Sequence, residues 1–238
     1  MNATDTCSIT ALVPIYNEIA TLKSSIPEIH KFLTSLGQPF EILIVESGSS
    51  DGSAMACDAL AARFSELVVI HEETRNGFGA ALRLGFTKAR MDFIWVIPVD
   101  QPYPLSTLTH AIPQMQTCDA VLSVRTGDER SIVRRIQSYV YTMLASFLLR
   151  QPAHSPNAAF KLYRRTLLQS LPLSSNGWFL DTEIAYRLRE RNCPLGTVGI
   201  LTTERQTGKS TVTPCDSWRM LKQLLAFRRR LADEKKHR

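Results

Sequence analysis

Short polar segments rich in carboxylates, hydroxyls and glycines recur along the first half of the chain, and each follows an apolar run. They read Pro-Ile-Tyr-Asn-Glu at 14–18, Glu-Ser-Gly-Ser-Ser-Asp-Gly-Ser at 46–53, Arg-Asn-Gly-Phe-Gly at 75–79 and Asp-Gln-Pro at 100–102. Open α/β sheets bind ligands just beyond the carboxyl ends of their strands, so hydrogen-bonding groups placed there are candidates for ligand binding. Gly, Ser, Asn and Asp also supply helix caps and positive φ angles, so each segment alone also fits an ordinary turn.

The apolar runs that position these segments are typical of a parallel sheet. Each is short and nearly continuous in apolar character, which suits strands covered on both faces. We expect strands at 8–13, 41–45, 67–70, 93–97 and 120–124. Helical periodicity separates them, at 18–36, 52–64, 79–89 and 105–115. The alternation predicts an α/β fold with an open, doubly wound, mostly parallel sheet and helices on both faces.

Beyond residue 125 this alternation weakens. A long helical stretch at 132–149 precedes a turn-rich segment, a short strand at 158–163 and a helix at 181–191. A strand at 197–202, a polar loop and a basic terminal helix complete the chain. Because no linker rich in Gly or Ser divides the sequence, we expect 1–217 to form one domain. We expect 218–238 to be a basic amphipathic helix or tail.

Composition excludes several classes of protein. The chain has 238 residues, of which 44% are apolar and 21% charged, enough to bury the core of an ordinary domain. No run reaches the roughly 18 apolar residues of a membrane-spanning helix, and the N-terminus lacks a signal-peptide pattern. We therefore expect a cytoplasmic protein. The five cysteines lack the spacing of a zinc site or a disulfide framework, which favours free thiols.

The positive charge is confined to the end of the chain. The segment 218–238 holds eight basic and two acidic residues, which accounts for the whole net charge of +6. Such a segment can meet anionic lipid, nucleic acid or only water. We do not expect nucleic-acid binding, because the rest of the chain is neutral and contains no recognised nucleic-acid-binding module.

Taken together, the polar segments resemble those of the family 2 inverting glycosyltransferases with the GT-A fold, most closely the dolichol-phosphate or polyprenyl-phosphate mannose or glucose synthases. The matching segments are VPIYNE at 13–18, ESGSSDGS at 46–53, NGFGAALRLGF at 76–86, AFKLYRR at 159–165, FLDTEI at 179–184 and ERQTGKS at 204–210. The resemblance implies that 1–124 binds a nucleotide sugar and that 125–217 forms the acceptor side. A dinucleotide-binding oxidoreductase fits less well, because Gly77, Gly79 and Gly85 follow the third expected strand rather than the first.

The resemblance implies a donor site. Pro14, Tyr16, Asn17 and Glu18 would frame the base and ribose, and Glu46 would accept a hydrogen bond from the base. Ser47 stands where the family has a second Asp, so a hydrogen-bonding group remains without the charge. Further nucleotide-sugar contacts are expected from Gly77, Gly79, Arg83, Arg125, Arg164, Arg205 and Lys209.

A divalent cation is the cofactor that the resemblance implies. The family places Asp-x-Asp where this chain has Asp100-Gln101-Pro102, so Asp100 is the expected catalytic and metal-binding acid and the second carboxylate is missing. One carboxylate with water can still bind Mg²⁺ or Mn²⁺, more weakly, against a diphosphate. Arg125, Arg164, Arg205 and Lys209 would supply the remaining positive charge, as such side chains do at other phosphate sites.

The chemistry of the acceptor side depends on the acceptor. A phosphate oxygen is already anionic, whereas a hydroxyl needs a carboxylate to take its proton. Asp181 and Glu183 are the catalytic candidates by resemblance, although at a helix start either acid also fits a capping role. The segment 155–159 departs from the family pattern by losing an acid, and His154 beside it is a weaker polar candidate.

Two segments favour a membrane-associated acceptor. The stretch 139–149 is nearly unbroken in apolar character and suits a buried helix or an apolar groove, and 218–238 has the composition of an interfacial helix. We therefore expect a glycosyltransferase that moves a sugar to a polyprenyl phosphate or another membrane-associated acceptor, peripheral on an anionic membrane. The alternatives are a soluble hydroxyl acceptor, and a catalytically impaired relative that binds nucleotide sugars or partners.

Overall fold

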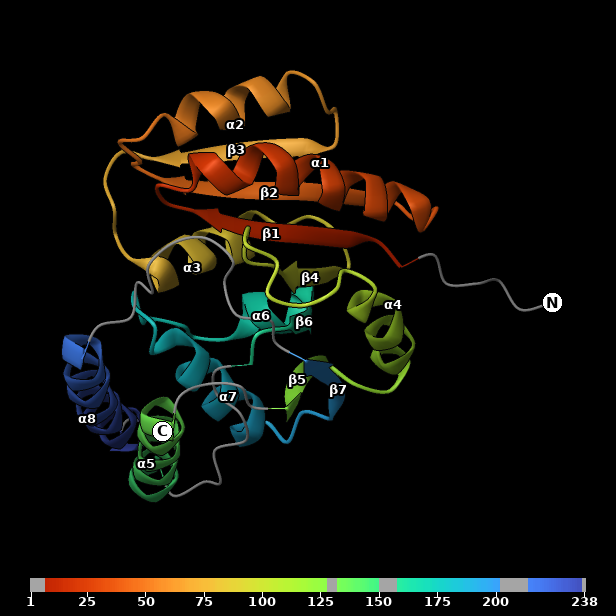
Figure 1. Cartoon of the computed structure of the whole chain (residues 1–238). Coiled ribbons are helices and arrows are strands. Elements are labelled where there is room, and N and C mark those ends of the chain that lie inside the picture. Colours follow the sequence, from red (N-terminus) through yellow and green to blue (C-terminus); the bar gives the residue numbers. More distant parts are fainter. Residues whose placement is uncertain (1–6, 128–131, 150–157, 202–213, 237–238) are drawn as a thin grey trace.

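A seven-stranded sheet forms the centre of the protein in the computed structural model (Figure 1). The structure describes residues 7–127, 132–149, 158–201 and 214–236. The strands are β1 (Ile9–Ile15), β2 (Phe40–Ser47), β3 (Leu67–Glu72), β4 (Phe93–Val96), β5 (Ala120–Gly127), β6 (Lys161–Arg164) and β7 (Leu195–Leu201). They lie in the order β3-β2-β1-β4-β6-β5-β7, and β6 runs antiparallel to both of its neighbours. The other pairs are parallel, so the expected open α/β sheet is confirmed.

Helices cover both faces of this sheet. One face packs against α1 (Ile19–Ser35), α2 (Ser53–Ala61), α4 (Thr107–Ala111) and the short 3₁₀ helix η1 (Ile112–Gln116). The other face packs against α3 (Phe78–Lys88), α6 (Arg165–Ser170) and α7 (Leu180–Glu190). In β1, Ala11 and Val13 pack with the first set and Leu12 with the second, so the strand is buried on both sides. This explains why its sequence is apolar throughout rather than alternating.

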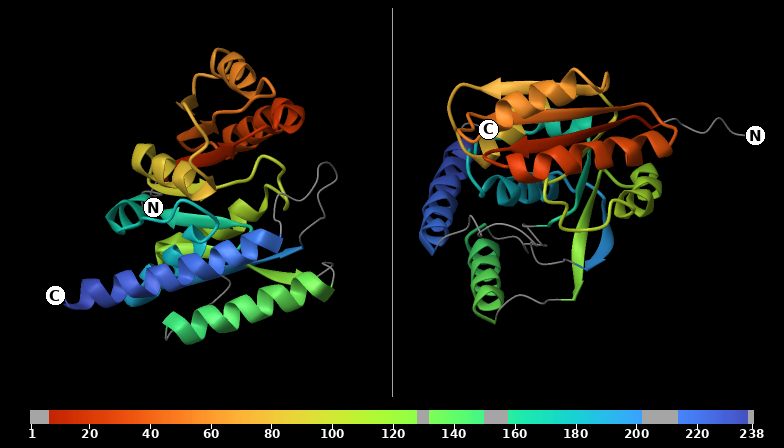
Figure 2. Two further views of the ribbon diagram at one scale, coloured as in Figure 1. Left: turned by 90° about the vertical axis from the view of Figure 1, so that its left-hand side faces the viewer. Right: turned by 45° about the horizontal axis from the view of Figure 1, so that its top comes forward.

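Two further helices pack on the second half of the chain. These are α5 (Ile132–Leu149) and α8 (Pro214–Lys236), and Figure 2 shows them side by side along the lower border of its left-hand view. Ala145 of α5, Phe179 and Tyr186 of the α7 region, and Leu224 and Phe227 of α8 belong to one buried cluster. The terminal helix is therefore packed against the protein along one side.

An ion pair also fixes α8 to α7. The guanidinium of Arg187, only 3% exposed, donates to both carboxylate oxygens of Glu234 at 2.9 Å. Arg230 of α8 donates to the hydroxyl of Ser174, in the loop before α7. Because α8 begins at Pro214, it starts before the tail that the sequence predicts at 218–238.

Several expected boundaries were wrong by a few residues. The strand expected at 158–163 is β6 at Lys161–Arg164, and the helix expected at 105–115 is divided into α4 and η1. The short helix α6 was not expected, because its single turn and a half shows too little periodicity. The helix at 132–149 was predicted with the observed bounds.

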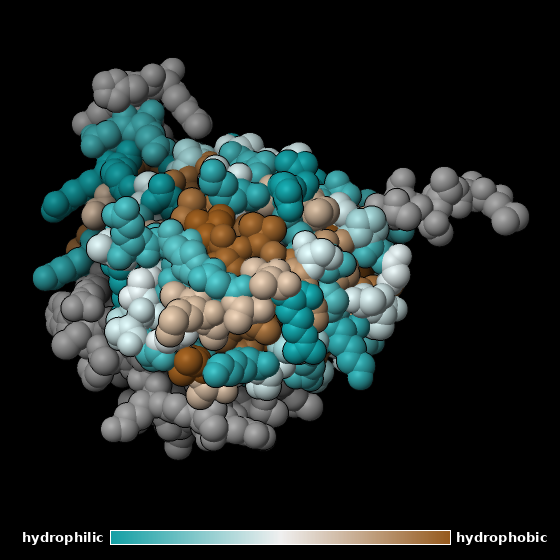
Figure 3. Space-filling model, turned by 90° about the horizontal axis from the view of Figure 1, so that it is seen from above, coloured by the Kyte–Doolittle hydropathy of each residue, from teal (hydrophilic) through white to brown (hydrophobic). Residues whose placement is uncertain are grey.

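Strand β3 is one of the two edge strands of the sheet, and β7 is the other. Val68, Val69 and Ile70 of this strand are only half-buried. Figure 3 looks onto this side of the molecule and shows hydrophobic residues gathered between hydrophilic ones.

Within the described ranges, no helix is long and apolar enough to cross a bilayer.

Candidate functional site

The loops after β1 and β2 are held together by hydrogen bonds. The backbone N–H of Asn17 donates to Ser49 Oγ at 3.0 Å, and the N–H of Ser50 donates to Asn17 Oδ1 at 2.8 Å. Asn17 has a φ of 53°, in the left-handed region that Asn tolerates better than most residues. The N–H of Glu18 donates to Ser53 Oγ at 3.1 Å. The segments at 14–18 and 46–53 therefore form one structure at the carboxyl edge of the sheet.

Asp51 joins the starts of two helices. Its Oδ2 accepts the N–H of Ile19, the first residue of α1, at 3.1 Å. Its Oδ1 accepts both the N–H and the hydroxyl of Ser53, the first residue of α2. Burial would raise the pKa of Asp51, but these hydrogen bonds outweigh it and hold the pKa below its ordinary value. The carboxylate is thus a capping group that joins the loops after β1 and β2.

Glu46 lies under the same loop and is 2% exposed. Its Oε1 accepts the N–H of Ser49 at 2.5 Å, and its Oε2 lies 3.0 Å from His71 Nδ1 at the end of β3. Burial works to raise the pKa of Glu46, yet the hydrogen bonds from His71 and Ser49 lower it below its ordinary value. Ser47 beside it donates to Glu72 Oε2 at 2.7 Å. The two residues predicted at this position are therefore both hydrogen-bonded to the end of β3.

Arg75 brings the loop after β3 onto the loop after β1. Its guanidinium lies 3.9 Å from the centre of the Tyr16 ring, a cation–π contact. The sequence analysis did not select Arg75 as a site residue. It is the first residue of the polar segment 75–79, which follows the strand expected at 67–70, and this position is the sequence signal that indicates it.

Gly77 and Gly79, at the start of α3, allow a close backbone approach. A Cβ at Gly79 would lie 2.6 Å from Gly177 O and 2.8 Å from Ser175 O, and one at Gly77 would overlap Asn176 O. Arg83 donates to Ser174 O at 3.1 Å and to Asn176 Oδ1 at 2.7 Å. The loop 174–177 is thus held against α3, and Arg83 contributes two of the hydrogen bonds that hold it.

Asp100 lies beyond the end of β4, where the strand order places it beside β1. The carboxylate is half-buried, and the following residue, Gln101, has a φ of 43°. Burial, chiefly, and the negative charge of Asp100 raise the pKa of the buried Tyr103 nearby. Across the described ranges, no group of three His, Cys, Asp or Glu side chains is placed to hold a metal ion. A single carboxylate fits Mg²⁺, which is commonly held by one or two carboxylates together with substrate phosphates.

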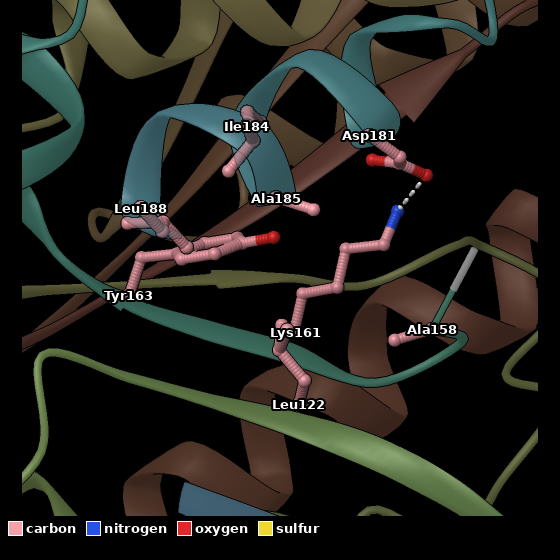
Figure 4. A pocket seen from close by; sticks show the side chains of 8 residues that line it. All are labelled: Leu122, Ala158, Lys161, Tyr163, Asp181, Ile184, Ala185 and Leu188. Atoms are coloured by element: carbon pink, nitrogen blue, oxygen red, sulfur yellow. Dashed lines mark hydrogen bonds and ion pairs between the residues drawn. The ribbon is translucent and has the colours of Figure 1, made fainter. Parts of the chain in front are cut away.

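Lys161 and Asp181 form a buried ion pair, drawn in Figure 4. Lys161 Nζ lies 2.6 Å from Asp181 Oδ2, and the two side chains are 9% and 8% exposed. Oδ1 of Asp181 is buried without a hydrogen-bond partner. Burial raises the pKa of Asp181, and the charge of Lys161 offsets only part of this effect.

The pair borders a small cavity between β6 and α7. Its walls are Leu122, Ala158, Lys161, Tyr163, Asp181, Ile184, Ala185 and Leu188. Lys161 pairs with Val96, the last residue of β4, so the ion pair lies at the binding edge of the sheet. The sequence analysis recognised AFKLYRR but did not select Lys161. Strand β6 is antiparallel to β4, so its first residue, Lys161, lies beside the last residue of β4, and the sequence does not reveal this strand direction.

Glu183, the second acid of α7, is fully buried and supports the loop before the helix. Its carboxylate accepts the N–H of Ser174 at 3.2 Å, the N–H of Ser175 at 2.8 Å and the hydroxyl of Ser174 at 3.1 Å. These contacts hold the same loop that Arg83 holds from the other side. Asp181 and Glu183 therefore have different surroundings, although both lie in the first turn of α7.

The remaining expected residues divide into three groups. Pro14 is half-buried in β1 and pairs with Val45. Arg164 lies at the opposite end of β6, beside the start of β4, where it donates to Asp119 Oδ1 at 3.2 Å and to Met115 O at 2.9 Å. We do not carry Arg164 into the candidate site. Those outside the described side chains are Arg125, His154, the segment 155–157, Arg205 and Lys209.

Sequence comparison gives a family and distant relatives. The model of the family "Glycosyl transferase family 2" matches residues 10–171. An undecaprenyl-phosphate 4-deoxy-4-formamido-L-arabinose transferase of Pseudomonas aeruginosa is 28% identical over 186 residues, which covers 73% of this chain and 55% of that protein. Glycosyltransferase AglD of Haloferax volcanii is 26% identical over 189 residues, covering 75% of this chain and 30% of that one. The chain thus spans about half or less of the length of these relatives.

Solved structures with the GT-A fold are similar over most of the chain. Glucosyl-3-phosphoglycerate synthase from Mycobacterium tuberculosis, solved with Mn²⁺, UDP and phosphoglyceric acid, superposes with a TM-score of 0.70 at 22% identity, covering 92% of this chain and 76% of that one. Mannosyl-3-phosphoglycerate synthase from Rubrobacter xylanophilus gives a TM-score of 0.71 at 19% identity, with coverages of 97% and 75%. The former enzyme has also been solved with Mg²⁺ and UDP.

Proposed function

Because this chain belongs to glycosyltransferase family 2, we propose that it moves a sugar, with inversion, from a nucleotide-diphosphate donor to a polyprenyl phosphate or another membrane-associated acceptor. The observation that carries the proposal is the joining of the loops after β1, β2 and β3 at one edge of the sheet, beside Asp100. Ligands of open α/β sheets bind at this edge. The relative from P. aeruginosa acts, by its name, on undecaprenyl phosphate.

The donor half offers the groups that a nucleoside diphosphate needs. Tyr16 and Arg75 form a cation–π contact between the loops after β1 and β3, and the buried carboxylate of Glu46 supports the loop after β2 through the N–H of Ser49. Asp100 would hold a divalent cation, and that cation supplies positive charge to the departing diphosphate when bound. The missing second carboxylate of Asp100-Gln101-Pro102 leaves more of the cation's coordination to the donor phosphates and to water.

The reaction would be a single displacement. An acceptor oxygen attacks the anomeric carbon of the sugar while the bond from that carbon to the diphosphate oxygen breaks, and the nucleoside diphosphate leaves with the electron pair. An ionised phosphate acceptor has no proton to lose at this step. Glu183 and Arg83 hold the loop 174–177 against α3, which fixes the acceptor side relative to the donor side.

Exposed side chains of α5 and α8 support a membrane-associated acceptor. Tyr139, Met143 and Phe147 recur at intervals of four residues on α5 and are 67%, 55% and 79% exposed, so they form one apolar stripe. Helix α8, packed beside α5, exposes the basic residues Lys222, Arg228 and Arg229. An exposed apolar stripe on one helix and exposed cations on the helix packed against it are the composition of a helix pair that lies at an anionic bilayer surface.

A hydroxyl acceptor is the second candidate, and Asp181 is the observation that favours it. Its Oδ1 is buried without a hydrogen-bond partner, and burial raises its pKa, which makes the carboxylate a stronger proton acceptor. For a hydroxyl acceptor, Asp181→Asn is expected to lower the transfer rate by about 10²- to 10⁴-fold. For an anionic phosphate acceptor, the folded fraction of the same variant keeps most of the rate.

The donor site is tested by calorimetric titration with UDP, GDP, dTDP and their sugar conjugates, with and without Mg²⁺ or Mn²⁺. We expect one nucleotide to bind with the metal, and Asp100→Asn to remove the metal dependence. Asp92→Asn is the matched control. Asp92 directly precedes β4, whereas Asp100 follows it, and Asp92 accepts hydrogen bonds from Ser8 at the other end of the strands. Binding of no nucleotide under any condition would contradict the proposal.

The acceptor is tested with the donor that binds. Radiolabelled sugar is followed into the lipid extract with undecaprenyl phosphate in vesicles, and into the aqueous phase with small hydroxyl compounds. Label in the lipid phase supports the first candidate. Label only in the aqueous phase, with loss in Asp181→Asn, supports the second candidate instead.

A further inference from the structure

His71 lies between two carboxylates at the end of β3. Its Nδ1 lies 3.0 Å from Glu46 Oε2 on β2, and its Nε2 lies 3.0 Å from Asp58 Oδ1 on α2. The His71 side chain is 40% exposed, whereas Glu46 is 2% exposed and Asp58 65% exposed. The imidazole therefore connects a buried acid under the donor loop with an acid at the surface.

The two contacts define the protonation state of the ring. An ionised carboxylate only accepts hydrogen bonds, so each ring nitrogen must carry a proton to bind its acid, and only the imidazolium carries both. The hydrogen bonds to Glu46 and then to Asp58 raise the pKa of His71 above its ordinary value. Cys57 of α2 is coupled to both acids that contact His71. Burial, chiefly, and the charges of Glu46, Asp58 and Asp51 raise the pKa of its thiol to about 12, so it stays neutral.

Glu46 transmits the state of His71 to the donor loop. One carboxylate oxygen binds His71 and the other binds the N–H of Ser49, whose hydroxyl in turn accepts from the N–H of Asn17. A neutral imidazole has a single N–H and two possible partners. When His71 loses one proton, one ring nitrogen presents a lone pair to a carboxylate. Either the hydrogen bond to Glu46 or the hydrogen bond to Asp58 is then lost.

We propose that His71, as an imidazolium, is a positioning residue that holds Glu46 and the loop 47–53 in the arrangement that binds the nucleoside diphosphate. This inference rests on the proposed function and deepens it by naming a residue that controls the donor site. His71 acts through Glu46 rather than on the donor. It makes donor affinity fall as the pH rises through the pKa of His71.

A second histidine provides a matched control. His30 Nε2 lies 3.1 Å from Glu66 Oε2, so it also pairs with a glutamate. Glu66 directly precedes β3, whereas His71 lies near the end of that strand, so the two pairs lie at opposite edges of the sheet. Substitution of His30 changes a similar contact without touching the donor loops.

The experiment measures protonation and binding separately. The imidazole proton resonances of the five histidines are titrated by NMR, with His71 assigned from its absence in His71→Gln. Affinity for UDP, GDP and dTDP is measured by calorimetry from pH 6 to pH 9 in wild type, His71→Gln and His30→Gln. We expect His71 to titrate above about 6.5. We expect wild-type affinity to fall about tenfold across that titration, and His30→Gln to follow wild type.

The expected result for His71→Gln is weaker binding at low pH and a flat dependence on pH. Asp58→Asn is expected to move the midpoint of the wild-type curve to lower pH, because it removes one anion that favours the imidazolium. A His71 that titrates at or below about 6.5 overturns the inference. So does a His71→Gln curve that coincides with that of wild type. If the wild-type protein binds no nucleotide at any pH, the proposed function fails together with the role of His71. If it binds a nucleotide without the expected pH dependence, only the role of His71 fails.

Discussion

The two halves of the molecule use charged side chains in different ways. In the first half, which we propose as the donor half, Glu46 and Asp51 accept hydrogen bonds from backbone N–H groups and hydroxyls, and their pKa values are lowered. In the second half, which we propose as the acceptor half, Lys161 and Asp181 are buried against each other, and the pKa of Asp181 is raised. Glu46 and Asp51 thus stabilise the loops after β1 and β2 through these hydrogen bonds. The buried pair contributes little net stability, because the cost of removing both charges from water offsets their attraction.

The largest effect is expected when the acceptor-side pair is broken. Lys161→Met leaves Asp181 buried without its cation, so we expect the free energy of unfolding to fall by about 3–5 kcal/mol. Urea unfolding followed by circular dichroism measures this change. The double variant Lys161→Met/Asp181→Leu removes both charges and should recover most of the loss. If Lys161→Met is as stable as the wild-type protein, burial of the unpaired Asp181 does not lower the free energy of unfolding, and this interpretation of the pair is wrong.

The surface of the acceptor half offers the next contrast. Replacing Lys222, Arg228 and Arg229 of α8 by Gln should weaken binding to phosphatidylglycerol vesicles by about 3 kcal/mol, at roughly 1 kcal/mol for each cation. Vesicle sedimentation at low salt measures the partition coefficient. The control replaces the exposed Lys23, Lys31 and Lys88 of the donor half, which removes the same charge from another surface. Equal losses in both variants would mean that net charge, and not the α5–α8 surface, attracts the membrane.

The contact that joins the halves can be tested at Gly79. A methyl group there meets the carbonyl oxygens of Ser175 and Gly177, so Gly79→Ala should lower the free energy of unfolding by about 1–3 kcal/mol. Gly37→Asn is the control, because a Cβ at Gly37 meets nothing within 4 Å and Asn tolerates its φ of 66°. Thermal unfolding measures both. If the two variants are equally stable, the loop 174–177 adapts and does not fix the halves.

The smallest effect expected is the pH dependence of the donor half. The lowered pKa values of Glu46 and Asp51 add stability that is present above about pH 4 and is lost as the pH falls through their folded values. The raised pKa of His71 adds stability that is present below about pH 6.5 and is lost as the pH rises through its folded value. Melting temperatures from pH 3 to pH 9 should show both limbs. His71→Gln should remove the alkaline limb and, because His71 helps to lower the pKa of Glu46, should also reduce the acid limb. Asp51→Asn should reduce the acid limb alone.

Local pattern was sufficient for the donor half. Nearly continuous apolar runs predicted β1, β2 and β4 within a few residues, since parallel strands buried on both faces leave that signature. The polar segments after them do lie together, as the hydrogen bonds of Asn17 and Glu18 to the second loop show. The roles assigned to individual site residues stay predictions, because no bound donor tests them.

The acceptor half was less predictable because its arrangement depends on distant partners. Nothing local in 158–163 reveals that β6 runs antiparallel, so the position of Lys161 was missed. Asp181 and Glu183 look equivalent in sequence, yet one meets Lys161 and the other meets the backbone of Ser174 and Ser175. The helix α5 was expected to be mainly buried, but Tyr139, Met143 and Phe147 are exposed, because α8 covers only one side of it.

The position of β6 also has a consequence for local unfolding. This strand of four residues lies between β4 and β5, so it links the donor-side strands to β5 and β7. If β6 detaches, the amides of β5 and β7 lose protection together while β1, β2 and β3 keep theirs. Native-state hydrogen exchange should therefore separate the sheet into two cooperative units, with the boundary at Lys161–Arg164. The acceptor side would then be able to loosen around a bulky substrate while the donor side remains folded.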